Sequence, residues 1–111
     1  MRIILASLIL TPFAAHAADP HAEAKAVMSA QCSACHRIPG VAGASGDIGP
    51  SLKGIAKRPQ IAGKLPNDQA NMVRWLMHPQ QVSPGTAMPE MGLTEDQARK
   101  IAAYLYTLDQ K

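Results

Sequence analysis

The only two cysteines of this 111-residue chain lie in one five-residue motif, Cys32-Ser33-Ala34-Cys35-His36. Two thiols at this spacing, followed at once by an imidazole, are typical of covalent haem attachment. Each thiol can add to a haem vinyl group to form a thioether, and His36 is placed to ligate the iron. Because so short a motif can arise by chance, the rest of the chain has to support this interpretation.

A six-coordinate haem iron needs a second axial ligand, and Met88 is the best-placed candidate. It lies in the segment PGTAMP at 84–89, which has a proline at each end and therefore loses little entropy when it holds a thioether against iron. Met91 is an alternative from the same region. His78 precedes a helix-ending proline and is expected at the surface, and His21 is expected too far from this side of the iron. The remaining candidates are Met72 and Met77.

A methionine ligand would have two consequences for the chemistry. Thioether sulfur favours ferrous iron and so raises the reduction potential of the haem. Because the protein would then fill both axial positions, oxygen or peroxide would find no open coordination site. This arrangement favours electron transfer over catalysis at the iron.

Residues 1–17 have the pattern of a cleaved export signal. Arg2 precedes an apolar run over 3–10, and Ala15-His16-Ala17 is a small-x-small cleavage site. The run is shorter than the ~20 residues that span a bilayer, and an uncut anchor is the alternative. We expect cleavage after this site, export to the periplasm, and one domain over 18–111 that does not insert into a membrane.

Composition excludes some functions and fits others. The formal charge of +3 falls to +2 when Arg2 is removed, and two haem propionates would roughly cancel it. No aromatic-interleaved basic patch is present, so we expect no nucleic-acid partner. Residues 18–111 contain three large aromatics, Trp75, Tyr104 and Tyr106. A haem would add apolar bulk to a core this small.

Helical periodicity predicts an all-α domain with about three main helices and irregular loops around one haem. The first helix is expected over 21–34, after an Asp19-Pro20 cap, and it would carry the haem motif at its C-terminal end. Segments 39–49 and 80–92 are rich in proline and glycine and are expected to be loops. A short helical turn is expected over 52–56.

The second and third helices have clear apolar faces. The second is expected over 68–77 with Asn67 as its cap, and it places Met72, Trp75 and Leu76 on one face. The third begins with a capping box at Thr94-Glu95-Asp96-Gln97 and is expected to reach residue 108. Its apolar face is formed by Ile101, Tyr104, Leu105 and Leu108.

Five stretches follow one another along the chain: CSACH at 32–36, GPSL at 49–52, WLMHP at 75–79, PGTAMP at 84–89 and IAAYL at 101–105. By this set and order the chain resembles the class I cytochromes c over essentially all of its mature part. It is most similar to small bacterial periplasmic cytochromes with one haem, and to the haem domains fused to copper-bearing oxidase subunits. No copper-ligand cluster is present in the sequence.

The resemblance implies one covalently bound haem c and several supporting residues. Pro50 would accept a hydrogen bond from the second nitrogen of His36 and so orient the ring. Arg58 and Thr86 would lie near haem propionates, and Trp75 would pack near the methionine loop. The alternatives are a plain turn proline, a solvated arginine and ordinary core packing. Structural roles at a crossing of the first and last helices are implied for Ala24, Met28 and Tyr104.

The resemblance also implies an electron carrier, not an enzyme, that acts as a monomer. Its redox partners would be a membrane quinol–cytochrome c reductase, a terminal oxidase or a periplasmic dehydrogenase. Gln80, Gln81 and Ala87 stand where mitochondrial relatives commonly have lysines, so strongly salt-dependent docking is not expected. A basic stretch that could orient an acidic partner, or simply be solvated, contains Lys53, Lys57, Arg58 and Lys64.

Two other functions remain open from the sequence. The first is a cytochrome subunit fixed in a periplasmic dehydrogenase or oxidase complex, which uses the same haem chemistry. The second is a thiol–disulfide oxidoreductase or metal-binding module that uses Cys32 and Cys35. The second is disfavoured, because such redox motifs usually occur in α/β folds and a zinc site needs more ligands than this motif offers.

Overall fold

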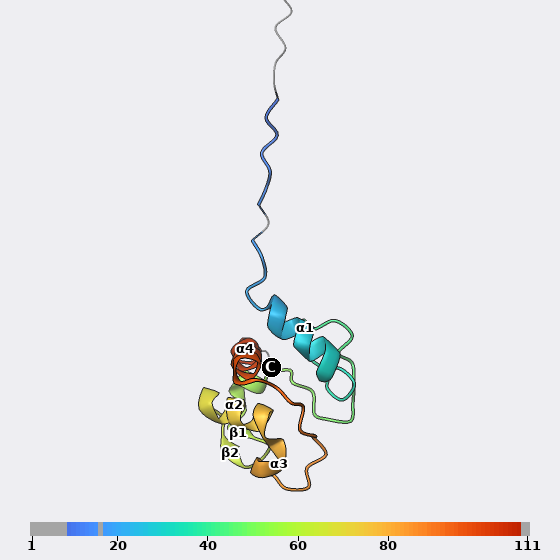
Figure 1. The fold of residues 1–111 in the computed structure, drawn as a ribbon, viewed down its shortest axis with the longest axis vertical. Helices are drawn as coiled ribbons and strands as arrows, with labels where there is room; N and C mark the ends of the chain where they lie inside the picture. Colours follow the sequence, from blue (N-terminus) through green and yellow to red (C-terminus); the bar gives the residue numbers. More distant parts are fainter. Residues whose placement is uncertain (1–8, 16, 110–111) are drawn as a thin grey trace, which may run out of the picture.

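The computed structural model describes residues 9–15 and 17–109. Much of the expected export signal, residues 1–8 and 16, lies outside this part. Residues 9–15 have no regular structure and lead away from the domain (Figure 1). Their large apolar side chains are exposed, and Phe13 is fully so. No helix in the described part of the chain has the length and apolar character required to cross a membrane.

The domain is mostly helical, as the periodicity predicts. Its main helices are α1 (Ala22–Gln31), α2 (Gln69–Met77) and α4 (Glu95–Leu105). Two further elements were not predicted: a four-residue helix α3 (Pro79–Val82), and a hairpin of β1 (Gln60–Ile61) and β2 (Leu65–Pro66). Elements of two to four residues are too short for a periodicity to be read. The helical turn expected over 52–56 is a 3₁₀ turn, η1 (Ile55–Lys57).

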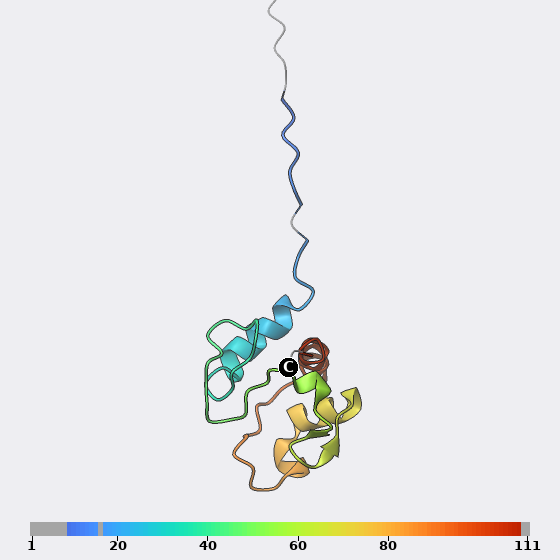
Figure 2. The same cartoon turned by 180° about the vertical axis from the view of Figure 1, so that it is seen from behind.

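The helices are arranged around α4. Both α1 and α2 pack against it, and α2 also packs against α3. Figure 1 and the reverse view in Figure 2 place α1 on one side of α4 and the α2, α3 and hairpin region on the other. The long segment 32–54 leads from α1 to the hairpin side of the domain, and the segment 83–94 leads from α3 back to α4 (Figure 2). The three residues implied at the helix crossing, Ala24, Met28 and Tyr104, are all buried, at 3%, 0% and 6% exposure.

The ends of the helices confirm some predictions and correct others. The Thr94–Gln97 capping box at the start of α4 is present in full. The helix ends at Leu105, before the expected residue 108, but Leu108 is buried all the same. The cap of α2 is Asp68, whose carboxylate accepts from the Asn71 amide, so the expected cap at Asn67 is wrong. Asp68 is one residue closer to the first helical turn, and its carboxylate suits the positive end of the helix dipole.

The first helix is shorter than predicted. It begins at Ala22 and ends at Gln31, three residues before the expected end, and the haem motif follows in a turn. His21 is the N-cap and no side chain caps the helix, so the expected cap at Asp19-Pro20 is wrong. Asp19 instead accepts a 2.8 Å bond from the His21 amide in the turn that precedes the helix. The side chain of Asp19 also pairs with Lys25 at 2.6 Å.

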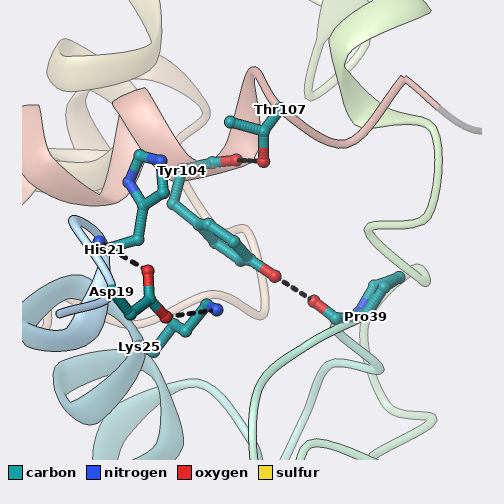
Figure 3. A network of polar contacts seen from close by, with 6 residues as sticks. All are labelled: Asp19, His21, Lys25, Pro39, Tyr104 and Thr107. Atoms are coloured by element: carbon teal, nitrogen blue, oxygen red, sulfur yellow. Dashed lines mark hydrogen bonds and ion pairs between the residues drawn. The ribbon is translucent and has the colours of Figure 1, made fainter. Parts of the chain in front are cut away.

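Tyr104 connects α4 by a hydrogen bond to the segment that follows the haem motif. Its hydroxyl donates a 2.5 Å hydrogen bond to the Pro39 carbonyl oxygen (Figure 3). The His21 ring lies tilted against its ring with centroids 5.3 Å apart, and the Lys25 ammonium is 5.0 Å from the centroid. These contacts join the start of α1 and the segment at Pro39 to the last helix.

Gly40 lies directly against this tyrosine, and its replacement tests the contact. Gly40 and Gly43 share a left-handed backbone, with φ of +77° and +71°. A β-carbon on Gly40 would collide with the Tyr104 hydroxyl, whereas one on Gly43 would meet nothing within 4 Å. We expect Gly43→Ala to cost about 1 kcal/mol of unfolding free energy.

Gly40→Ala should cost about 2–4 kcal/mol, because the collision also displaces the hydroxyl from the Pro39 carbonyl. Denaturant unfolding of both variants measures the difference. Equal losses would show that the tyrosine yields freely and that its bond to Pro39 contributes little.

Candidate haem-binding site

The haem motif forms a single turn directly after α1. The Cys32 amide closes the helix on the Met28 carbonyl oxygen at 2.8 Å. The amides of Cys35 and His36 then donate back to the Cys32 carbonyl oxygen at 3.2 and 2.9 Å. The two cysteines form no disulfide with each other, and both are only partly exposed. The turn therefore presents two thiols and an imidazole from five consecutive residues.

The imidazole of His36 is held by the loop that returns at 49–52. Its Nδ1 lies 2.8 Å from the Pro50 carbonyl oxygen, which is the contact implied by the resemblance. The Gly49 amide donates a 2.7 Å bond to the Cys35 carbonyl oxygen and keeps the loop against the motif. With Nδ1 as the donor to Pro50, the other ring nitrogen, Nε2, carries a free lone pair and can ligate a metal.

Gly49 touches the face of this ring, so its replacement should disturb the imidazole. A β-carbon there would lie 2.5 Å from His36 Cε1 and 2.8 Å from Nδ1, closer than real carbon contacts allow. The ring would have to turn and weaken its bond to Pro50. In haem-loaded protein we expect Gly49→Ala to shift the reduction potential and the visible spectrum and to cost about 1–3 kcal/mol of stability.

Gly43→Ala is the matched control for this variant, because it adds the same methyl group away from His36. It should leave the spectrum and potential unchanged. An unaltered spectrum and potential in Gly49→Ala would mean that the ring is not confined by the loop.

The turn and the loop border a cavity of about 390 Å³, within the usual range of small-molecule and cofactor sites. Its walls are mostly apolar. Arg58 is the one Lys, Arg, Asp or Glu among its lining residues. Ile48, which is 75% exposed, stands at this cavity. The apolar lining includes Met28, Leu52, Ile55, Ile61, Met72, Leu76, Ile101 and Leu105.

Met88 reaches the same cavity from a different part of the chain. It follows α3 in an irregular loop, is partly buried and packs against the core. Of the other candidate ligands, Met72 and Met91 also line the cavity. The cavity lining does not include His21, Met77 or His78. His78 instead lies 3.9 Å from the Glu90 carboxylate and is about half exposed.

The remaining residues predicted for the site, Arg58, Trp75 and Thr86, all line the cavity. The Arg58 guanidinium donates to the main-chain oxygens of Ser51 and Lys53, so its charge is held at this position. Gln80, on α3, hydrogen-bonds to the loop that carries Met88, a role that no pattern in the sequence indicates. A single glutamine in a proline-rich segment has no spacing or periodicity that would reveal its partner.

Burial dominates the electrostatics of the Cys32 thiol. Burial raises the pKa of the Cys32 thiol, and proximity to Cys35 raises it further. Cys32 therefore stays protonated to higher pH than an ordinary thiol. In the described part of the chain, no three His, Cys, Asp or Glu side chains form a metal-binding cluster.

The cavity fits the group that the sequence predicts. A haem is a flat apolar macrocycle with two carboxylates. The walls are mostly apolar, which suits the macrocycle. The lining also contains the thiols of Cys32 and Cys35, the imidazole of His36 and the thioether of Met88. The guanidinium of Arg58 offers a partner for a carboxylate. The donor set suits haem iron, which takes axial imidazole and thioether ligands.

Comparison with known proteins agrees with this geometry. The family model described as Cytochrome c matches residues 21–109. The chain is 36% identical over 102 residues to cytochrome c2 of Rhodoblastus acidophilus, with 80% of this chain and 92% of that protein covered.

Two longer relatives are cytochrome c oxidase subunit 2 from Bacillus sp. (strain PS3) and from Alkalihalophilus pseudofirmus. Their identities are 33% over 95 residues and 32% over 78 residues. The matches cover 81% and 69% of this chain but only 27% and 22% of the subunits, so the chain corresponds to about a quarter of each.

Proposed function

The chain belongs to the cytochrome c family, whose members transfer electrons on a covalently bound haem c, and from this premise we propose that it is a periplasmic carrier with His36 and Met88 as axial ligands. The observation that carries the proposal is the single cavity lined by Cys32, Cys35, His36 and Met88. These residues come from two segments about fifty positions apart, and the fold brings them to one apolar space.

The haem, when bound, supplies the redox chemistry, since its iron alternates between ferrous and ferric states. The chain's own residues would hold the group in both states. Cys32 and Cys35 anchor the group covalently. His36 is fixed in ring orientation and tautomer by the Pro50 carbonyl oxygen, 2.8 Å from Nδ1.

Met88 would close the second axial position. A thioether there stabilises the ferrous state and raises the reduction potential. It also excludes small ligands, so the protein passes electrons without doing chemistry on oxygen or peroxide. Arg58 would neutralise a propionate with a charge-assisted hydrogen bond. Thr86 and Trp75 would complete the polar and apolar surroundings of the haem on the methionine side.

The redox titration and ligand binding of the haem-loaded protein test this function together. We expect a reversible one-electron titration and a ferrous form that binds carbon monoxide very slowly at neutral pH. Rapid carbon monoxide binding would show that the sixth position is open, which contradicts a pure carrier.

A fixed subunit is the second candidate function, and two relatives favour it. Both are named cytochrome c oxidase subunit 2, and in each the matching region is about a quarter of the protein. The match to a small cytochrome c2 over 92% of that protein favours the free carrier. Purification of the native protein in mild detergent distinguishes them: a free carrier elutes alone as a monomer, and a subunit elutes with its enzyme.

Export completes the proposal. Residues 1–17 would be removed as a signal and residues 18–111 would form the mature haem domain. The partners would be a quinol–cytochrome c reductase, a terminal oxidase or a periplasmic dehydrogenase. The N-terminal sequence of the periplasmic protein tests the first step, and a mature chain that begins near Ala18 is expected.

A further inference from the structure

Gln80, the second residue of α3, bonds to the main chain of the methionine loop through every polar atom of its side chain. Its Nε2 donates to the carbonyl oxygens of Thr86 and Met88, at 2.8 and 2.9 Å. Its Oε1 accepts from the amide of Gly85 at 3.1 Å. Two acceptors on one side of the amide and a donor on the other also fix which way the amide faces.

The loop needs such a partner because it has little structure of its own. Residues 83–94 form no helix or strand, so their main-chain N–H and C=O groups lack the regular hydrogen-bond partners that such elements provide. The Thr86 amide bonds to the Ser83 carbonyl oxygen at 3.0 Å within the loop. The Thr86 hydroxyl is 3.5 Å from the Met88 amide, too long to hold it firmly.

A second bond fastens the far side of the loop to the same residue. The carboxylate of Glu90 accepts a 3.1 Å bond from the main-chain amide of Gln80. Met88 therefore lies within a stretch, 85–90, that is attached to residue 80 both at 85–88 and at 90. Since α3 packs on α2, and α2 packs on α4, these attachments connect the loop to the packed helices of the domain.

We propose that Gln80 is the positioning residue of the sixth haem ligand: its side-chain amide holds the Met88 main chain so that the thioether stays on the iron. The proposal rests on the His36/Met88 ligation proposed above. Gln80 itself touches no part of the reacting group and acts only through Met88. Its loss should favour detachment of the sulfur while leaving the cysteine and histidine attachments intact.

The rate at which imidazole binds the ferric protein measures this detachment, because the sulfur must leave before imidazole can enter. A net hydrogen bond corresponds to a factor of roughly five to ten in an equilibrium constant. Gln80→Ala removes three such bonds, so we expect imidazole to bind at least about tenfold faster. The weak near-infrared sulfur-to-iron band should also lose intensity, and the reduction potential should fall.

Gln80→Glu is the sharper variant, since it keeps the size of the side chain and an acceptor for the Gly85 amide. It places a second oxygen against the carbonyl oxygens of Thr86 and Met88, so it should behave like Gln80→Ala or worse. Gln81→Ala is the matched control, because Gln81 is the exposed neighbour on the same helix. It should match the wild type in all three measurements.

Each outcome decides between the proposals. Faster imidazole binding in both Gln80 variants, with wild-type rates in Gln81→Ala, supports the positioning role. Wild-type rates and band in the Gln80 variants overturn it, even if unfolding shows reduced stability, while a band lost in Met88→Ala would still uphold the ligation. A wild-type protein without the band would overturn the ligation and, with it, the role of Gln80.

Discussion

Replacing both Cys32 and Cys35 by alanine, in cells that express a haem-attachment system, will yield a chain from which all haem is extracted on denaturation. Thioethers are the covalent link that survives unfolding, and the chain has no other cysteine to form one. The loss should extend to the fold. An unfilled cavity of about 390 Å³ would cost up to ~9 kcal/mol at ~24 cal/mol per Å³.

That cost is an upper estimate because the cavity opens to water, yet it is comparable with the ~5–15 kcal/mol stability of a whole domain. We therefore expect the double variant to have little cooperative unfolding unless free haem is supplied. The single variants Cys32→Ala and Cys35→Ala serve as controls, since each retains one thioether. Haem that stays with the denatured double variant would contradict the attachment.

Met88→Ala should have the second largest effect. With no thioether at the iron, the near-infrared band is lost and the reduction potential falls by on the order of 0.1 V, part of the ~0.8 V range that axial ligands span. Carbon monoxide should then bind the ferrous protein readily. The covalent haem should remain, because Cys32, Cys35 and His36 are unchanged.

Two other methionines provide the controls for this variant. Met91 lines the same cavity as Met88, whereas Met77 is not among the lining residues. Met91→Ala and Met77→Ala should both keep the band and the potential of the wild type. A band that survives in Met88→Ala and disappears in Met91→Ala would assign the sixth ligand to Met91 instead.

Features that depend on residues close together in the sequence could be predicted. The Thr94–Gln97 capping box and the apolar face of α4 are confirmed, because both depend on residues within a few positions of one another. The haem motif and the methionine loop were identifiable for the same reason: each is a short segment with a specific composition. The order of five such segments then predicted the family, which the family match confirms.

Features set by tertiary partners could not be predicted. Asn67 is a good N-cap by composition, but its side chain donates to the Ile55 and Arg58 carbonyl oxygens and accepts from the Tyr106 hydroxyl. Asp68 is left to cap α2. Only the folded structure brings those partners together, since they lie 9 to 39 positions away.

The methionine loop illustrates the same limit within the site. The sequence indicates Met88, but not the side chain that holds its loop, because the bonds of Gln80 run to main-chain atoms that carry no residue-type signal. The helix α3 that presents Gln80 is only four residues long. For such contacts, spacing and composition give no information.

The most direct test of the central claim is whether haem remains with the denatured protein. The full chain, with its signal, would be expressed beside a haem-attachment system, unfolded in acid and extracted with organic solvent, and its mass and reduced spectrum recorded. The account predicts one haem per chain, retained through Cys32 and Cys35. A chain with the mass of the apoprotein, despite competent attachment machinery, would contradict it. That result would favour a thiol–disulfide or metal-binding function for the two cysteines.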